Sequence, residues 1–85
     1  MIIVYDIDVE RVNKVCQFLR RHLNWIQNSV FEGELSRAHF EEVKTGLKEI
    51  IDKDVDSVLV FTVLQKKLLR KEVIGVEKMP VSQFI

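Results

Sequence analysis

The hydrophobic positions begin with a continuous apolar run, residues 1–5, that is rich in β-branched side chains. Such a run is typical of a strand covered on both faces, so we expect a central strand here. After Asp8, which is placed to cap a helix, apolar residues recur at helical spacing to about residue 22. This apolar stripe includes Cys16, which we therefore expect in the core.

The middle of the chain predicts an irregular strand, a second helix and a second apolar strand. Residues 24–34 have no cleanly apolar face, which indicates a bulge or a tight turn near Asn28. Apolar positions return to helical spacing over residues 36–52 and then form a nearly continuous run at 57–64. The basic stretch 65–71 is predicted as a loop.

This order of elements predicts one α+β domain, residues 1–85, with the ferredoxin-like arrangement βαββαβ. In that arrangement the strand at 57–64 lies at an edge of the sheet, yet it is too apolar for an uncovered edge. The segment 73–85, with a candidate short strand at 73–76, is placed to cover it. We expect this tail to be an additional C-terminal strand exchanged in a two-fold homodimer; folding back within its own chain is the alternative.

Composition narrows the class of protein without giving its function. The 85 residues are 47% hydrophobic with three Gly and one Pro, which excludes disordered and low-complexity chains. No apolar run approaches the ~20 residues of a membrane span, and the N-terminal segment lacks the basic leader of a secretory signal. The single cysteine cannot form an internal disulfide. We therefore expect a cytoplasmic protein with no membrane partner.

Charge is balanced overall but unevenly distributed. The 13 basic and 13 acidic residues give a net charge of zero, with acidic residues concentrated in the middle of the chain and basic clusters on either side. Phosphate contacts depend on local positive potential, so these clusters are candidates for nucleic-acid binding, and a solvated surface is the alternative. The clustered candidates are Arg20, Arg21, Lys66, Lys67, Arg70 and Lys71.

Asp6 is the main candidate for chemistry, because it closes an apolar strand at an end of the sheet where ligands gather. A carboxylate there must be capped, paired or bound to a cation, and Asp8 already suits the capping role. One carboxylate is a poor magnesium site, but two copies of Asp6 near a dimer axis would share one Mg²⁺. His22 and His39 lie on separate predicted helices, with no spacing that suggests a catalytic or metal pair.

Three segments resemble the CRISPR-associated Cas-two family: V-Y-D-I at 4–7, Q-N-S-V-F-E-G at 27–33 and D-S-V at 56–58. The resemblance covers essentially the whole chain in length and order, and the second segment is its most specific part. It implies a ferredoxin-like homodimer with exchanged C-terminal strands. It also implies metal-dependent endonuclease activity on RNA or duplex DNA, and a bridging role between two dimers of the Cas-one integrase in spacer acquisition.

The family's metal aspartate corresponds to Asp6, and its serine and phenylalanine near the substrate correspond to Ser29 and Phe31. A basic residue early in the first helix corresponds to Arg11. From the residues themselves, Phe31 is explained at least as well as a core residue. The chain departs from the family at residues 25–26, Trp-Ile, where many members have arginine, and this weakens the expectation of strong substrate binding.

Two functions follow from the resemblance. The first is a dimeric DNA-binding adaptor for the Cas-one integrase. The second is magnesium-dependent hydrolysis of a phosphodiester, with Asp6 as the catalytic and metal-binding residue; no residue in the sequence identifies itself as the general base. A ferredoxin-like domain that binds a small molecule, without nuclease activity, is the alternative.

Overall fold

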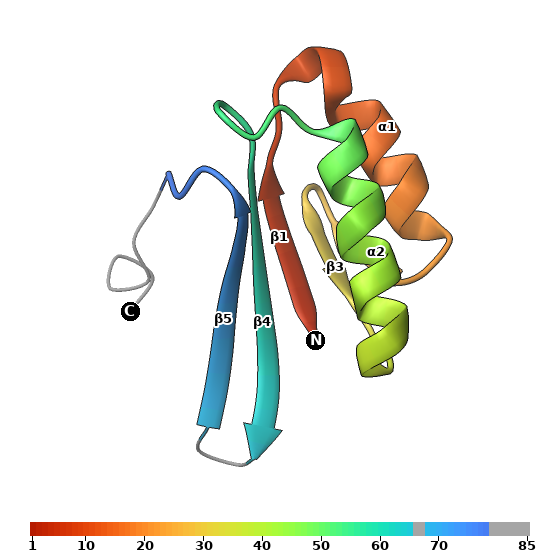
Figure 1. The fold of residues 1–85 in the computed structure, drawn as a ribbon. Coiled ribbons are helices and arrows are strands. Elements are labelled where there is room, and N and C mark those ends of the chain that lie inside the picture. The colour runs from red at the N-terminus through yellow and green to blue at the C-terminus, as the bar shows by residue number, and fades with distance from the viewer. Residues whose placement is uncertain (66–67, 79–85) are drawn as a thin grey trace.

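The computed structural model describes residues 1–65 and 68–78, which form one antiparallel sheet with two helices on one of its faces (Figure 1). The sheet order is β2-β3-β1-β4-β5, so the described strands place β1 at the centre, as its apolar run predicts. The predicted α+β arrangement βαββαβ is confirmed, with one additional strand. In chain order the elements are β1 (Ile2–Asp6), α1 (Val9–Arg20), β2 (Asn24–Gln27), β3 (Val30–Glu32), α2 (Arg37–Ile50), β4 (Ser57–Gln65) and β5 (Leu68–Gly75).

Both helices begin at the residues that the sequence predicts. The side chain of Asp8 accepts a hydrogen bond from the backbone N–H two residues later at 3.4 Å, and Ser36 Oγ accepts one from three residues later at 3.1 Å. These caps satisfy N–H groups that have no partner within the helix. The helices end two residues earlier than expected, at Arg20 and Ile50. Neither described helix is long and apolar enough to cross a membrane.

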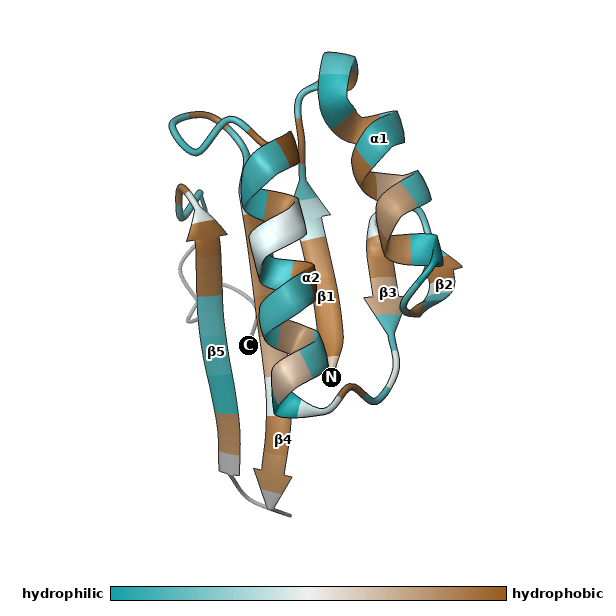
Figure 2. Ribbon diagram, turned by 45° about the vertical axis from the view of Figure 1, so that its right-hand side comes forward, coloured by the Kyte–Doolittle hydropathy of each residue, from teal (hydrophilic) through white to brown (hydrophobic). Residues whose placement is uncertain are grey.

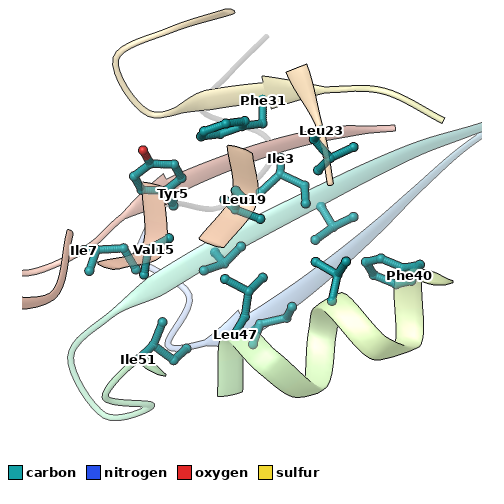
Figure 3. Packing of buried hydrophobic residues seen from close by; sticks show 14 residues of the cluster. Ile3, Tyr5, Ile7, Val15, Leu19, Leu23, Phe31, Phe40, Leu47 and Ile51 are labelled. Carbon is teal, nitrogen blue, oxygen red and sulfur yellow. The ribbon is translucent and has the colours of Figure 1, made fainter. Parts of the chain in front are cut away.

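The core lies between the sheet and the two helices, where side chains from every layer meet (Figure 3). The rings of Tyr5 and Phe31 stack with their centroids 6.1 Å apart. Burial raises the pKa of Tyr5 to about 12, and a hydrogen bond with the Cys16 thiol acts in the same direction. Cys16 is half-buried and packs against the core, as predicted. The core residues with no exposed surface are Ile3, Val15, Leu19, Phe31, Val43, Leu47 and Val58.

The irregular segment in the middle of the chain is a short hairpin with a bulge. The pairing between β2 and β3 shifts register between Trp25 and Gln27. Asn28, at the turn, has a positive φ of 41°, a conformation that asparagine tolerates better than most residues. The predicted bulge or tight turn is therefore confirmed.

The predicted loop at 65–71 is wrong in its described part, because β5 already begins at Leu68 and pairs with β4 as far as Ser57↔Gly75. Charged residues in this segment suggested a loop, but β5 is an edge strand of the described sheet, and charge is favourable on an edge. The described chain thus covers the edge of β4 with its own strand. Exchange with a partner stays a prediction, and residues 66–67 and 79–85 lie outside the described residues.

β1 and β4 are apolar along most of their length (Figure 2). They therefore present apolar side chains also on the face of the sheet that points away from both helices, here called the open face. Because Ile3 and Val60 point into the core, the neighbouring positions in each strand point the opposite way. Three of these side chains are well exposed: Ile2 at 42%, Val63 at 66% and Leu69 at 55%. Val4, Leu59 and Phe61 belong to the same face.

Candidate metal and nucleic-acid site

The end of β1, the start of α1 and the turn before β4 meet at one end of the sheet, at the top of Figure 1. Asp6 is the last residue of β1 and pairs in register with Ser57, the first residue of β4. Because side chains alternate along a strand, Asp6 lies on the open face together with Ile2 and Val4. Its side chain is 73% exposed, so the carboxylate is accessible to a ligand.

Lys78 provides a cation beside this carboxylate. Its Nζ lies 3.5 Å from Asp6 Oδ2 and donates a hydrogen bond of 3.4 Å to the backbone oxygen of Asp6. The chain leaving β5 is held nearby, because the Val76 N–H donates to the backbone oxygen of Asp56 at 2.9 Å. The sequence required Asp6 to be capped, paired or bound to a cation, and in this structure it is paired with lysine.

A second carboxylate, Asp56, lies directly before β4 and has no exposed surface. Arg11 donates to it twice, from Nε to Oδ2 at 2.6 Å and from Nη2 to Oδ1 at 3.1 Å. The backbone N–H groups of Asp8 and Asp52 donate to the same carboxylate at 2.9 and 2.8 Å. The hydrogen bonds from Arg11 hold the pKa of Asp56 well below its usual range, with smaller contributions from the two backbone donors.

Arg11, which the resemblance places near a phosphate, is therefore already occupied by carboxylates. Besides Asp56, its Nη1 contacts Glu10 Oε1 at 3.0 Å, and its side chain is only 20% exposed. Hydrogen bonding to Asp56 raises the pKa of Arg11, so the guanidinium stays charged. In this structure Arg11 connects the first turn of α1 to the turn before β4, and its charge is compensated within the protein.

The other two residues taken from the resemblance lie in different environments. Ser29 is half-buried at the same end of the sheet as Asp6, since its backbone oxygen accepts from the N–H of Tyr5 at 3.1 Å. Phe31 has no exposed surface and packs in the core, so no base can stack on it while the core is closed. The core interpretation of Phe31 is the one that this structure supports.

The clustered basic residues that the structure describes do not gather around Asp6. Arg20 and Arg21 stand at the C-terminal end of α1, whose 12 residues span about 18 Å from the end nearest Asp6. The Arg20 guanidinium lies 4.9 Å from the centre of the Trp25 ring, in a cation–π contact. The departure from the family at residues 25–26 thus has a local explanation, because Trp25 stacks with an arginine of this chain.

The basic residues of β5 are arranged on both faces of that strand. Arg70 is exposed and pairs in register with Thr62, whereas Lys71 forms an ion pair with Glu77. Lys66 and Lys67 lie outside the described residues. Of the predicted phosphate contacts with described side chains, Arg20, Arg21 and Arg70 are exposed to solvent.

No group of three or more His, Cys, Asp or Glu side chains that could hold a metal ion occurs within residues 1–65 and 68–78. Each chain offers one exposed carboxylate group at this position, that of Asp6. Mg²⁺ binds one or two carboxylates and completes its coordination with water, so Asp6 fits one half of such a site. The site predicted from the sequence takes its other half from a second copy of the chain.

Two histidines that the sequence did not pair lie together in the structure. His22 Nδ1 is 2.9 Å from His39 Nε2. The spacing indicated no catalytic or metal pair, and the contact arises because the packing of α1 against α2 brings together side chains 17 positions apart. No sequence spacing within either helix could have indicated this contact.

Comparison with known proteins shows similarity over the full length of the chain. The model of the family described as CRISPR associated protein Cas2 matches residues 1–71. The CRISPR-associated endoribonuclease Cas2 of Methanocaldococcus jannaschii is 51% identical over 85 residues, which cover 100% of this chain and 75% of that protein. The protein of the same name from Pyrococcus furiosus is 52% identical over 85 residues, covering 100% and 98%. A solved structure titled "Crystal structure of cas2" is 48% identical, with a TM-score of 0.71, over 94% of this chain and 90% of that one.

Proposed function

Because the chain belongs to the CRISPR-associated Cas2 family, we propose that it is an endoribonuclease that hydrolyses RNA phosphodiesters with a divalent metal ion held at Asp6. The supporting observation is an exposed carboxylate at the end of the central strand, on the open face of the sheet. Asp56 at this end is buried and fully hydrogen-bonded. The exposed Asp8 and Glu10 beside it serve the helix cap and Arg11. Asp6 is the most exposed of these carboxylates.

A second copy of the chain completes the site in this proposal. Ile2, Val63 and Leu69 expose apolar surface on the face that carries Asp6, and such a patch favours association with another protein surface. If two copies of the chain packed their open faces together about a two-fold axis, this apolar surface would be buried. Both Asp6 side chains would then approach the same point. The exchanged C-terminal strand belongs to the same proposal, for the residues that follow β5.

Each functional residue of the chain then has a distinct task. When bound, Mg²⁺ supplies charge that polarises the phosphodiester and lowers the pKa of a coordinated water. Asp6 from each subunit holds the ion, and Lys78 must release Asp6 for the ion to bind. Ser29, at the same end of the sheet, is the hydroxyl placed to donate to a phosphate oxygen. Arg11 positions the start of α1 through Asp56 and does not contact substrate.

The substitution Asp6→Asn tests this function. It removes the charge that the ion requires and keeps the size of the side chain, so magnesium-dependent RNA cleavage should fall by at least ~100-fold, about 2.7 kcal/mol in the barrier. Asp8→Asn is the matched control two residues away, because asparagine caps a helix as well as aspartate, and it should cleave at the parental rate. Parental cleavage by Asp6→Asn would reject the site.

We also propose that the dimer is a DNA-binding adaptor for the Cas-one integrase in spacer acquisition. Arg20, Arg21 and Arg70 support this role because they are exposed and separate from Asp6. Charge reversal at Arg20 and Arg21 should weaken binding to duplex DNA of any sequence and reduce the salt dependence, while RNA cleavage is retained. Capture of the integrase with duplex DNA by Asp6→Asn, at the parental level, would separate the adaptor role from the nuclease. If the charge reversal changes neither the affinity for duplex DNA nor its salt dependence, these arginines do not contact the DNA.

A further inference from the structure

The contact between His22 and His39 joins the two helices away from the Asp6 site. His22 follows the C-terminal end of α1, and His39 lies in the first turn of α2. Their facing nitrogens, Nδ1 of His22 and Nε2 of His39, are 2.9 Å apart, and both rings are half-buried. The ring planes are nearly perpendicular, at 74°, with centroids 5.0 Å apart. Each imidazole thus turns one nitrogen toward the other ring.

Local packing fixes both rings in this arrangement. The Phe18 ring lies against His22, with centroids 5.0 Å apart, and it also rests on Gly46 of α2. A Cβ at position 46 would approach Phe18 Cζ to 2.3 Å, so the glycine permits the close approach of the helices. On the other side, Ser36 Oγ fixes the backbone N–H of His39. The pair is therefore held by the same contacts that hold α1 against α2.

The spacing of the two nitrogens suits a shared metal ion. In a neutral pair one ring donates its facing N–H to the other ring. When a cation binds, the donor ring carries its proton on its other nitrogen instead, so both facing nitrogens supply a lone pair. Zinc binds imidazole at about 2.0–2.1 Å, which places two tetrahedral ligand nitrogens about 3.3 Å apart. Exchanging the hydrogen bond for a metal bridge thus needs a separation only a few tenths of an ångström greater.

We propose that His22 and His39 form a two-histidine chelate for a divalent transition-metal ion of the class that prefers imidazole, with Zn²⁺ as the probe. Water completes the coordination, since no third His, Cys, Asp or Glu in the described part of the chain joins the pair. With two protein ligands the affinity is lower than that of a four-ligand structural zinc site. Mg²⁺, which requires oxygen ligands, is excluded from this position. The bound ion links α1 to α2 and stabilises the folded chain.

Calorimetric titration with Zn²⁺ tests the proposal directly. The intact chain should bind one ion, and His22→Gln or His39→Gln should each lower the affinity by at least 10-fold. Cys16→Ser is the matched control, because it removes the thiol that could bind zinc elsewhere. This control should bind as the parent does. Equal affinity in the parent and in His22→Gln, or the absence of binding by the parent, would overturn the proposal.

Thermal unfolding supplies a second measurement. At a zinc concentration 100-fold above Kd, the melting temperature of the parent should rise by about 15 °C, because the ion binds only the folded state. Neither histidine variant should show this rise. If a variant fails to fold, nitrogen NMR of the parent decides: zinc should shift His22 Nδ1 and His39 Nε2 together, and unshifted resonances would overturn the proposal.

Discussion

Asp6 and Asp56 are two aspartates at the same end of the sheet, and their environments are opposite. Asp56 has no exposed surface and accepts four hydrogen bonds, two from Arg11 and two from backbone N–H groups. Asp6 is 73% exposed and its carboxylate has one ion pair, with Lys78. The first carboxylate is satisfied by the fold, whereas the second keeps oxygen atoms available to an external cation.

The difference follows from how deeply each carboxylate is buried. A buried carboxylate must be fully hydrogen-bonded, and once it is, its removal leaves a charged partner uncompensated. An exposed carboxylate contributes little to stability, so it can be used for binding. Arg11 illustrates the consequence: placed near the site by its position in the chain, it is committed to Asp56 and to the connection between α1 and β4.

The largest expected effect comes from Asp56→Asn, which removes the charge of the buried aspartate. Arg11 loses its buried partner and keeps the exposed Glu10. The free energy of unfolding should therefore fall by about 3 kcal/mol, the lower end of the range for a broken buried ion pair. Denaturant titration measures this change. Asp6→Asn, the exposed counterpart, should stay within about 0.5 kcal/mol of the parent. Equal effects of the two substitutions on the free energy of unfolding would contradict the conclusion that Asp56 stabilises the fold and Asp6 does not.

The contrast between the two aspartates could be predicted from the sequence only in part. The cap at Asp8 and the turn at Asn28 were predicted because such signals depend on neighbouring residues. Asp6 was identified because it ends an apolar run. The role of Asp56 was not, because its partner Arg11 lies 45 positions away and nothing local marks the pair.

Other features of the fold depend on tertiary context in the same way. The strand from Leu68 was missed because charged residues on a sheet edge have the composition of a loop. The sequence around Phe31 fits both a core residue and a residue that stacks on a base. Only its packing in the folded chain distinguishes the two roles. The contact between His22 and His39 requires the helices to be placed first. Sequence reasoning thus located the elements and the exposed carboxylate, but not the long-range pairs.

Acid unfolding is expected to show the next largest effect. The pKa of Asp56 is lower in the folded chain than in the unfolded chain, so its contribution is complete above about pH 4 and is lost as the pH falls further. Over that range this one group gives at most about 1.4 kcal/mol per pH unit. Denaturation midpoints measured from pH 5 to pH 2 should therefore fall less steeply in Asp56→Asn than in the parent. If the midpoints of the parent and of Asp56→Asn fall equally steeply, other carboxylates cause the acid sensitivity.

The smallest expected effect concerns Lys78, which links the exposed aspartate to the chain after β5. Its ammonium group lies 3.5 Å from Asp6 Oδ2, and the two side chains are 39% and 73% exposed, so the pair is worth less than about 1 kcal/mol. Any Mg²⁺ that binds Asp6 must displace it. Lys78→Gln should therefore raise the affinity for Mg²⁺ about two- to fivefold and leave the unfolding free energy unchanged.

Carboxyl-carbon NMR of Asp6 during a Mg²⁺ titration measures this affinity without relying on cleavage. Lys71→Gln is the matched control, since it removes a lysine paired with Glu77 on the same chain segment and should leave the titration unchanged. A Mg²⁺ affinity that does not change in Lys78→Gln would show that Lys78 does not compete for the carboxylate. A lower affinity would show instead that Lys78 orients Asp6 for the ion. The exposed aspartate would then be held in place by a neighbouring basic side chain, as Asp56 is by Arg11.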